Sequence, residues 1–238
     1  MAEVIDLGEF TAEVSYKDIK HIHLSVYPPE GAVRISAPHR MKLDTIRVFA
    51  ITRLDWIRRQ RRKFKEQPRE APREFLNRES HYLWGRRYLL QRLEHQGAAK
   101  VQISGKYLQV FIRPSSELEN LKEAVAEYYR AHVRTAAHPI IEKWSKALGV
   151  SLERFYVQHM KTKWGSCNPS TRTIRLNTEL AKKPRECLEY IIVHELVHLL
   201  EPSHNERFVN IMDTYMPNWK EVKATLNKLP VKHDKWIY

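Results

Sequence analysis

Three side chains in one short stretch have the types and spacing of a metal-dependent hydrolytic site. Residues 191–200 read IIVHELVHLL, with a His-Glu-x-x-His pattern at His194, Glu195 and His198. Residues four apart lie on one face of a helix, so both imidazoles can bind one metal ion. Glu195 follows the first ligand directly and can accept a proton from a metal-activated water.

A third imidazole follows a break in this helix. Pro202 disfavours helical geometry at the residue before it, which predicts that the helix ends near Leu200. Ser203 and Glu206 fit a capping box, so a second helix is expected to carry His204 in its first turn and to fold it back toward the other histidines. Rival third ligands are Glu201, Glu206 and Asp213.

The ligand set predicts the metal. Imidazole nitrogens suit zinc, and a catalytic zinc with three protein ligands keeps its fourth position for water. We therefore expect one zinc ion per chain, bound by His194, His198 and His204, with Glu195 as general base. Other divalent metals are compatible with the same nitrogen ligands.

The N-terminal part is expected to be β-rich, with one long helix that presents apolar residues at helical spacing from Ile46 to Phe64. Prolines 68 and 72 mark a loop after it. Strands are expected at residues 11–16, 21–27, 33–37, 80–95 and 99–113.

The C-terminal part is expected to begin with a long helix over residues 117–147, which Gly149 ends. Short strands at 153–158, 163–167 and 172–176 should precede the metal helix. The predicted fold class is α+β, with a β-rich part over residues 1–115 and a catalytic part over 116–238. In the catalytic part a small mixed sheet is expected to pack on the metal helix.

Composition limits the partners. The 41 basic and 28 acidic residues give a net charge of +13, which attracts polyanions. A basic run from Arg58 to Lys65, next to Trp56 and Phe64, could bind nucleic acid, and its alternative reading is the solvated side of a helix. No apolar stretch is long enough for a transmembrane helix, so no membrane association is expected.

The cysteines and the N-terminus predict a location. Cys167 and Cys187 are too few for a disulfide framework, which favours a reducing cytoplasm. The acidic N-terminal residues lack the features of a secretory signal. Cys167 is expected to be a small buried residue and Cys187 to pack in the metal helix.

The hairpin before the metal helix offers candidate substrate contacts. Lys161, Lys163 and Arg172 could orient an anionic substrate, because ammonium charges and guanidinium groups suit phosphate. Trp164 is a candidate substrate contact, although packing is its commoner role. The alternative for the basic residues is a solvated strand face.

Three segments resemble the YgjP-like family of metal-dependent hydrolases, which belong with the zincin-type metallopeptidases. They are KTKWGSC at residues 161–167, TIRLN at 173–177 and HELVHLLEPSHNERF at 194–208. The resemblance is strongest over residues 156–227. It implies a zincin-like catalytic part, zinc bound by His194, His198 and His204, and Glu195 as catalytic base. Some relatives carry a label as uridine triphosphate pyrophosphatases.

Three functions remain open at this point. The first is a zinc-dependent metallopeptidase, whose cleft needs an exposed strand edge that can pair with a peptide. The second is a nucleoside triphosphate pyrophosphatase that uses the same metal site and needs basic groups converging near the metal. The third is a nucleic-acid-associated protein with a structural or vestigial metal site. Glu195 argues against the third, because a structural site needs no base. The oligomeric state is not readable from the sequence.

Overall fold

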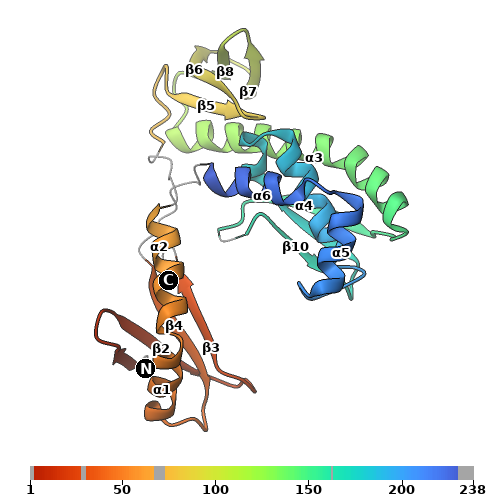
Figure 1. Cartoon of the computed structure of the whole chain (residues 1–238). Coiled ribbons are helices and arrows are strands. Elements are labelled where there is room, and N and C mark those ends of the chain that lie inside the picture. Colours follow the sequence, from red (N-terminus) through yellow and green to blue (C-terminus); the bar gives the residue numbers. More distant parts are fainter. Residues whose placement is uncertain (1–2, 28–30, 67–72, 162, 230–238) are drawn as a thin grey trace. The chain divides into compact units, whose positions relative to one another are not determined.

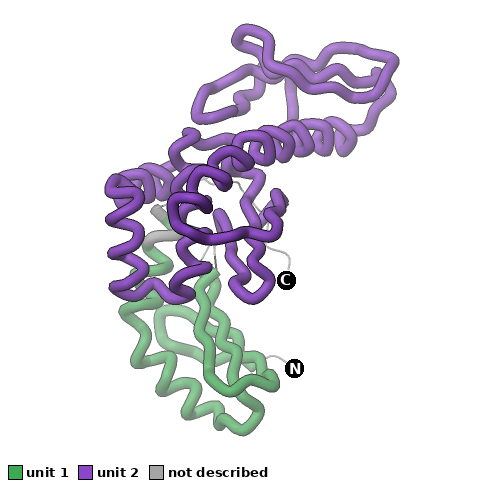
Figure 2. Tube along the Cα trace, turned by 90° about the vertical axis from the view of Figure 1, so that its right-hand side faces the viewer, with its two compact units in different colours: residues 1–69, 235–238 green, residues 70–234 purple. Residues whose placement is uncertain are grey.

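The protein divides into two compact units. The computed structural model describes residues 3–27, 31–66, 73–161 and 163–229. The first unit comprises residues 1–69 with 235–238, and the second comprises residues 70–234 (Figure 2). The division lies earlier in the chain than the boundary expected between residues 115 and 116.

The first unit is a four-stranded sheet with two helices (Figure 1). Its strands lie in the order β1-β2-β4-β3, with β2 and β4 parallel and the outer pairs antiparallel. Ile5, Val14 and Ile35 of the sheet form one buried cluster with Ile46 and Ile57 of the helices. The elements are β1 (Glu3–Asp6), β2 (Thr11–Lys17), β3 (His23–Tyr27), β4 (Ala32–Pro38), α1 (Leu43–Thr52) and α2 (Leu54–Glu66).

Two expectations for this unit need correction. The single long helix is two helices, because the chain breaks at Arg53, whose φ of −108° and ψ of 5° leave the helical region. Strand β1 was not expected either. It is only four residues long, and its place depends on antiparallel pairing with β2 rather than on a pattern of its own.

The second unit begins with a sheet of the same topology. Its strands are β5 (Ser80–Leu83), β6 (Arg86–Glu94), β7 (Lys100–Ser104) and β8 (Tyr107–Ile112), in the order β5-β6-β8-β7. The inner strands β6 and β8 are again parallel, and the outer pairs are again antiparallel. The chain therefore uses one arrangement of four strands twice, each time followed by a helix, although the sequence shows no internal repeat.

Helix α3 (Leu118–Leu148) joins this sheet to the rest of the second unit (Figure 1). Its 31 residues span about 46 Å at 1.5 Å per residue. It contacts β7 and β8 of the sheet as well as β9 and α4. Buried residues of the sheet, of α3 and of α4 form one hydrophobic cluster, which explains why residues 73–112 belong to the second unit.

The remaining elements surround the candidate metal helix. Strands β9 (Arg154–Gln158), β10 (Gly165–Asn168) and β11 (Thr173–Asn177) form a sheet in the order β10-β11-β9, with β9 and β11 parallel and β10 and β11 antiparallel. The helices that follow are the 3₁₀-helix η1 (Thr178–Lys182), α4 (Arg185–Val197), α5 (Glu206–Tyr215) and α6 (Trp219–Lys228). The α+β class and the small mixed sheet against the metal helix are confirmed. Among the described residues, we find no helix with the length and apolar character of a membrane span.

A buried histidine ties β5 to α3. His81 is 1% exposed, and its Nε2 lies 3.3 Å from Glu79 Oε1. Its Nδ1 lies 3.5 Å from the hydroxyl of Tyr129 on α3. Burial lowers the pKa of His81 to about 3, and the charges of Arg73 and Lys182 add to this effect. The folded protein therefore holds His81 in its neutral form.

This histidine predicts a loss of stability in mild acid. Because the pKa of His81 falls from 6.5 to about 3 on folding, its contribution is fully present above pH 6.5 and is lost progressively below it. Between pH 7 and pH 5 this group should cost roughly 2 kcal/mol of unfolding free energy. Urea unfolding of wild type and His81→Phe at both pH values measures the difference. Equal pH dependence in the two proteins would contradict the assignment.

Candidate metal centre

Helix α4 presents its histidine from a buried surface. Cys187, Leu188, Ile192 and Leu196 are fully buried. His194, in the last turn of the helix, is partly exposed. The apolar burial holds α4 in one position, so the backbone that carries His194 has little freedom to move.

The three expected histidines converge. The Nε2 atoms of His194 and His204 are 3.0 Å apart. Ring centroids are 4.9 Å apart for His194 with His198, 4.9 Å for His194 with His204, and 4.7 Å for His198 with His204. One ligand atom from each residue lies within 4.8 Å of the others. The sequence expectation and the geometry therefore name the same three residues.

The corner after α4 differs from the expected one. The helix ends at Val197, and His198 is its C-cap. Asn205 rather than Ser203 caps α5, because its side chain accepts a hydrogen bond of 3.0 Å from the backbone N–H of Phe208. His204 therefore lies just before α5 and not in its first turn. Ser203 instead donates its backbone N–H and its hydroxyl to Glu201, at 3.2 and 2.8 Å.

Phe208 supports all three imidazoles. It is 2% exposed, and its ring centroid lies 5.0 Å from that of His194, 4.9 Å from that of His198 and 4.8 Å from that of His204. The Asn205 cap positions this residue, since it holds the Phe208 backbone in the first turn of α5. A local cap therefore contributes to the shape of the candidate metal centre.

The rival ligands are engaged elsewhere or lie outside the cluster. Glu201 Oε1 accepts the two bonds from Ser203. Asp213 accepts a bond of 2.6 Å from Trp219 Nε1 and contacts Lys220 at 3.0 Å. Among the described residues, the group of possible metal ligands that includes these histidines contains neither of these carboxylates nor Glu206.

The donor chemistry of this cluster fits a divalent metal. Burial, together with the nearby histidines, lowers the pKa of His194 to about 3, so its ring is neutral and keeps a lone pair for a metal. His198 Nδ1 lies 3.1 Å from the carbonyl oxygen of Glu201, to which a neutral imidazole donates its N–H. That bond leaves Nε2 as the free donor atom. Imidazole nitrogens are among the ligands that zinc favours.

Glu195 is buried beside the histidines. Only 5% of it is exposed, and burial raises its pKa to about 7, against the opposing charge of Lys163. Strand β10 lies very close to it. A Cβ atom on Gly165 would lie 2.6 Å from Glu195 Oε1 and 2.8 Å from Ile191 Cγ2, which real Cβ atoms do not tolerate. The absence of a side chain at Gly165 thus lets the strand and the carboxylate touch.

Asn177 is a residue of this region that the sequence analysis missed. Its side chain is 4% exposed and donates bonds of 2.7 and 2.8 Å to the carbonyl oxygens of Met160 and Lys163. It also accepts from the backbone N–H groups of Met160 and Glu179. Asn177 therefore holds the backbone of Lys163, whose charge acts on Glu195. Only its place in the TIRLN motif pointed to it.

The predicted substrate residues have different surroundings. Arg172 lies in the turn of the β10–β11 hairpin, where its Nε donates a bond of 2.8 Å to the carbonyl oxygen of Ser151. Trp164 is partly buried, with Lys183 Nζ 5.8 Å from its ring centroid. Lys161 and Lys163 are exposed. The charge of Lys163 thus acts on the Glu195 carboxylate, and Arg172 has a bond within the fold.

The two cysteines fit packing roles. Cys187 is fully buried in α4, as expected. Cys167 is partly buried, and burial raises the pKa of its thiol to about 11, with the charge of Glu195 as a second cause. The thiol therefore stays protonated near neutral pH, which disfavours a nucleophilic role.

The basic run on α2 is partly occupied within the first unit. Arg58 forms ion pairs with Glu9 at 2.8 Å and with Asp55 at 3.1 Å. The guanidinium of Arg61 lies 4.8 Å from the ring centroid of Phe10. The side chains of Lys63 and Phe64, which belong to the same prediction, lie outside the described part of the chain.

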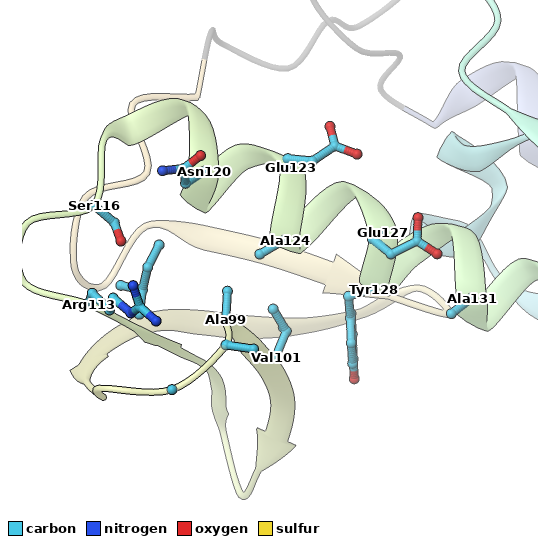
Figure 3. A pocket seen from close by; sticks show the side chains of 13 residues that line it. Ala99, Val101, Arg113, Ser116, Asn120, Glu123, Ala124, Glu127, Tyr128 and Ala131 are labelled. Atoms are coloured by element: carbon cyan, nitrogen blue, oxygen red, sulfur yellow. The ribbon is translucent and has the colours of Figure 1, made fainter.

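Two cavities lie away from the metal centre. Figure 3 shows one of about 660 Å³ between α3 and the sheet, where Ala99 and Val101 face Ala124 and Tyr128. A second, of about 420 Å³, lies along α3 beside Trp84. None of the three histidines or Glu195 lines either cavity.

The contact at Gly165 gives a testable prediction. Gly165→Ala should displace Glu195 or β10, so we expect turnover to fall by about tenfold to a hundredfold, since small misplacements of catalytic groups are costly. Stability should fall by roughly 1–3 kcal/mol through overpacking. Steady-state kinetics, metal content and thermal unfolding measure these effects. Ser166→Ala on the same strand is the control, and equal turnover in both variants would contradict the prediction.

Comparisons with known proteins bear on this site. A family model described as YgjP-like, metallopeptidase domain, matches residues 20–229. Among solved structures, the chain is similar to the metallopeptidase zymogen of Pyrococcus abyssi abylysin, with a TM-score of 0.35, 21% identity, and coverage of 37% of this chain and 90% of that chain. It is also similar to the metallopeptidase zymogen of Methanocaldococcus jannaschii jannalysin, with a TM-score of 0.34, 28% identity, and coverage of 37% and 85%. No curated protein matches.

Proposed function

Because this chain belongs to the YgjP-like metallopeptidase family, it is a metal-dependent hydrolase, and we propose that it hydrolyses peptide bonds with one zinc ion. In this proposal His194, His198 and His204 bind the ion, and Glu195 is the general base. The observation that carries it is the convergence of three imidazoles beside a buried carboxylate.

The ligands and the base have separate roles. When bound, a zinc ion supplies Lewis acidity, which makes water a better nucleophile and polarises the substrate carbonyl. Glu195 accepts the proton of the attacking water on its carboxylate and passes it to the nitrogen of the leaving amine. The bond to the Glu201 carbonyl orients His198. Phe208 keeps all three rings in place.

The edge of the catalytic sheet suits a peptide substrate. In the described part of the chain, β10 pairs with β11 on one side only, so its other edge can pair with an extended chain. Gly165, at the start of this strand, is the residue that approaches Glu195. A peptide paired with β10 would therefore pass close to the base.

Hydrolysis of a nucleoside triphosphate such as uridine triphosphate is the second candidate. It is favoured by Lys163, a cation whose charge acts on Glu195 and whose backbone Asn177 holds. A structural metal site in a nucleic-acid-associated protein has less support, because the base is present and Arg58 and Arg61 have partners within their own unit.

One experiment compares the two substrate classes. The zinc-loaded protein is incubated with a peptide library and, separately, with nucleoside triphosphates, and products are identified by mass spectrometry. We expect peptide products with wild type and none with Glu195→Gln. Release of pyrophosphate without peptide cleavage would replace the peptidase proposal with the second candidate. Products that persist unchanged in Glu195→Gln would remove the base from the mechanism.

A further inference from the structure

The two edges of the β5–β8 sheet have different surroundings. Strand β5 contacts η1, and just after this strand the backbone N–H groups of Trp84 and Gly85 donate bonds of 2.7 and 3.3 Å to the carbonyl oxygens of Ala181 and Lys182. At the other edge, β7 pairs with β8 and with no further strand in the described part of the chain. One side of the β7 backbone therefore offers hydrogen bonds to an additional strand.

Strand β7 lacks the features that usually keep an edge strand unpaired. Such strands commonly carry charges, a proline or a bulge. The centre of β7 consists of Val101, Gln102 and Ile103, with neither a charge nor a proline. Its register with β8 is continuous from Lys100 to Ser104, so it contains no bulge. The strand is therefore suited to pairing with another extended chain.

A cavity of about 660 Å³ lies beside this strand, between β7 and α3. Across it, Ala99 and Val101 face Ala124 and Tyr128 of α3 (Figure 3). Because side chains alternate along a strand, a chain added to β7 would direct every second side chain toward α3. The alanines that line the cavity leave room for those side chains, and the partly buried Tyr128 supplies an apolar wall. We call this cavity and the free edge of β7 the β7–α3 groove.

Charged residues at the rim of the groove give it a polarity. Arg113 lies just before α3, and its Nε donates a bond of 3.1 Å to the carbonyl oxygen of Gln96. It has no acidic partner among the residues that the structure describes. Farther along α3, Glu123 and Glu127 both form ion pairs with Arg130, so two carboxylates share one guanidinium. The groove is therefore positive at the start of α3 and negative farther along it.

We propose that the β7–α3 groove docks an extended peptide segment of a partner protein, which adds to the four-stranded sheet at the free edge of β7. The segment presents an apolar side chain to Tyr128, an acidic residue to Arg113 and a basic residue to Glu123 and Glu127. None of the three histidines lines this cavity, so the docking site is separate from the candidate metal centre and goes beyond the proposed function.

The test uses a synthetic peptide and the full chain with Glu195→Gln, in which the probe is not hydrolysed. The probe alternates valine and threonine between an aspartate and a lysine, and it is made in both orders because a strand can add parallel or antiparallel. Calorimetry measures affinity, and hydrogen–deuterium exchange with mass spectrometry locates the protected backbone. We expect one order to bind more tightly and to slow exchange in β7. Protection in β10 without protection in β7 would overturn the docking site.

A charge exchange tests the polarity of the groove. Arg113→Glu should weaken binding of the tighter probe by about twofold to fivefold, as loss of an exposed ion pair does. Replacing the aspartate of the probe with lysine should then restore its affinity for this variant. An affinity that depends on neither charge would contradict the assigned orientation and chemistry of the segment.

Filling the groove tests its location. Ala124→Trp places a large ring in the cavity and should weaken binding by more than about tenfold through steric exclusion. Ala126→Trp is the matched control, because Ala126 is on the same helix and does not line the cavity. Thermal unfolding checks that each variant is folded, and Ala131→Trp, at an exposed position of the lining, serves as a second blocking variant.

Two results would overturn the proposal. The first is equal affinity of the probe for the blocking variants and for Ala126→Trp. The second is self-association of the protein without peptide that Ala124→Trp abolishes, since this would assign the groove to a second copy of the chain. Sedimentation velocity of the full chain measures self-association directly.

Discussion

Replacing Glu195 with glutamine should abolish most of the turnover while the metal stays bound. The substitution keeps the size of the side chain and removes the base, and loss of a general base costs about a hundredfold to ten-thousandfold in rate. Glu195 is 5% exposed, and the histidine cluster is complete without it. The loss of activity is measured as turnover of the best peptide from the library, and metal retention is measured as the zinc content of the same preparation.

The control for this prediction is the ligand variant His204→Ala. It removes one of the three converging nitrogens, so zinc affinity should fall together with activity. Loss of zinc from Glu195→Gln would make Glu195 a ligand and would contradict the proposed roles. Full zinc affinity in His204→Ala would require another third ligand, with Glu201, Glu206 and Asp213 the ones to test next.

The second large effect is expected from the double variant His194→Ala/His198→Ala. Wild type purified without chelator should contain about one zinc per chain, because three imidazoles and an open position form one catalytic site. The double variant keeps only His204, and its zinc content should approach zero. Inductively coupled plasma mass spectrometry measures the ratio of metal to protein directly.

Thermal stability provides a second, independent test of the double variant His194→Ala/His198→Ala. A ligand that binds only the folded state stabilises it, so zinc should raise the unfolding temperature of wild type and not that of the double variant. The partly buried His194 and His198 also pack against Phe208, so a modest loss of stability without metal is expected in the variant. Undiminished zinc content in the double variant would refute the metal site.

Much of the fold could be predicted from local patterns. The helix over residues 117–147 is observed as α3, and the left-handed Gly149, with φ of 65°, ends it as expected. The hairpin of β10 and β11 and the helix that carries His194 were also predicted. Each of these depends on apolar periodicity or on a turn residue, which nearby residues encode.

The boundaries of helices and units and the pairing of strands were harder to predict from the sequence. The break at Arg53 has no proline or glycine to mark it. The division of the chain after residue 69 follows from packing of the β5–β8 sheet on α3, and the shared topology of the two four-stranded sheets follows from strand pairing. Both depend on contacts between segments far apart in the sequence, which periodicity does not report.

For the candidate site, the sequence by itself determined the types and order of the groups: two histidines four apart on a helix, the glutamate between them and a third histidine after a break. The helical repeat of 3.6 residues brings the first two together before any packing occurs. The tertiary structure decided the surroundings. Gly165 meets Glu195 across 30 residues of sequence, Asn177 holds the backbone of Lys163, and Phe208 of α5 packs against all three histidine rings. These neighbours could not be predicted because burial of separate elements against α4 places them, and no local pattern records which elements will pack together.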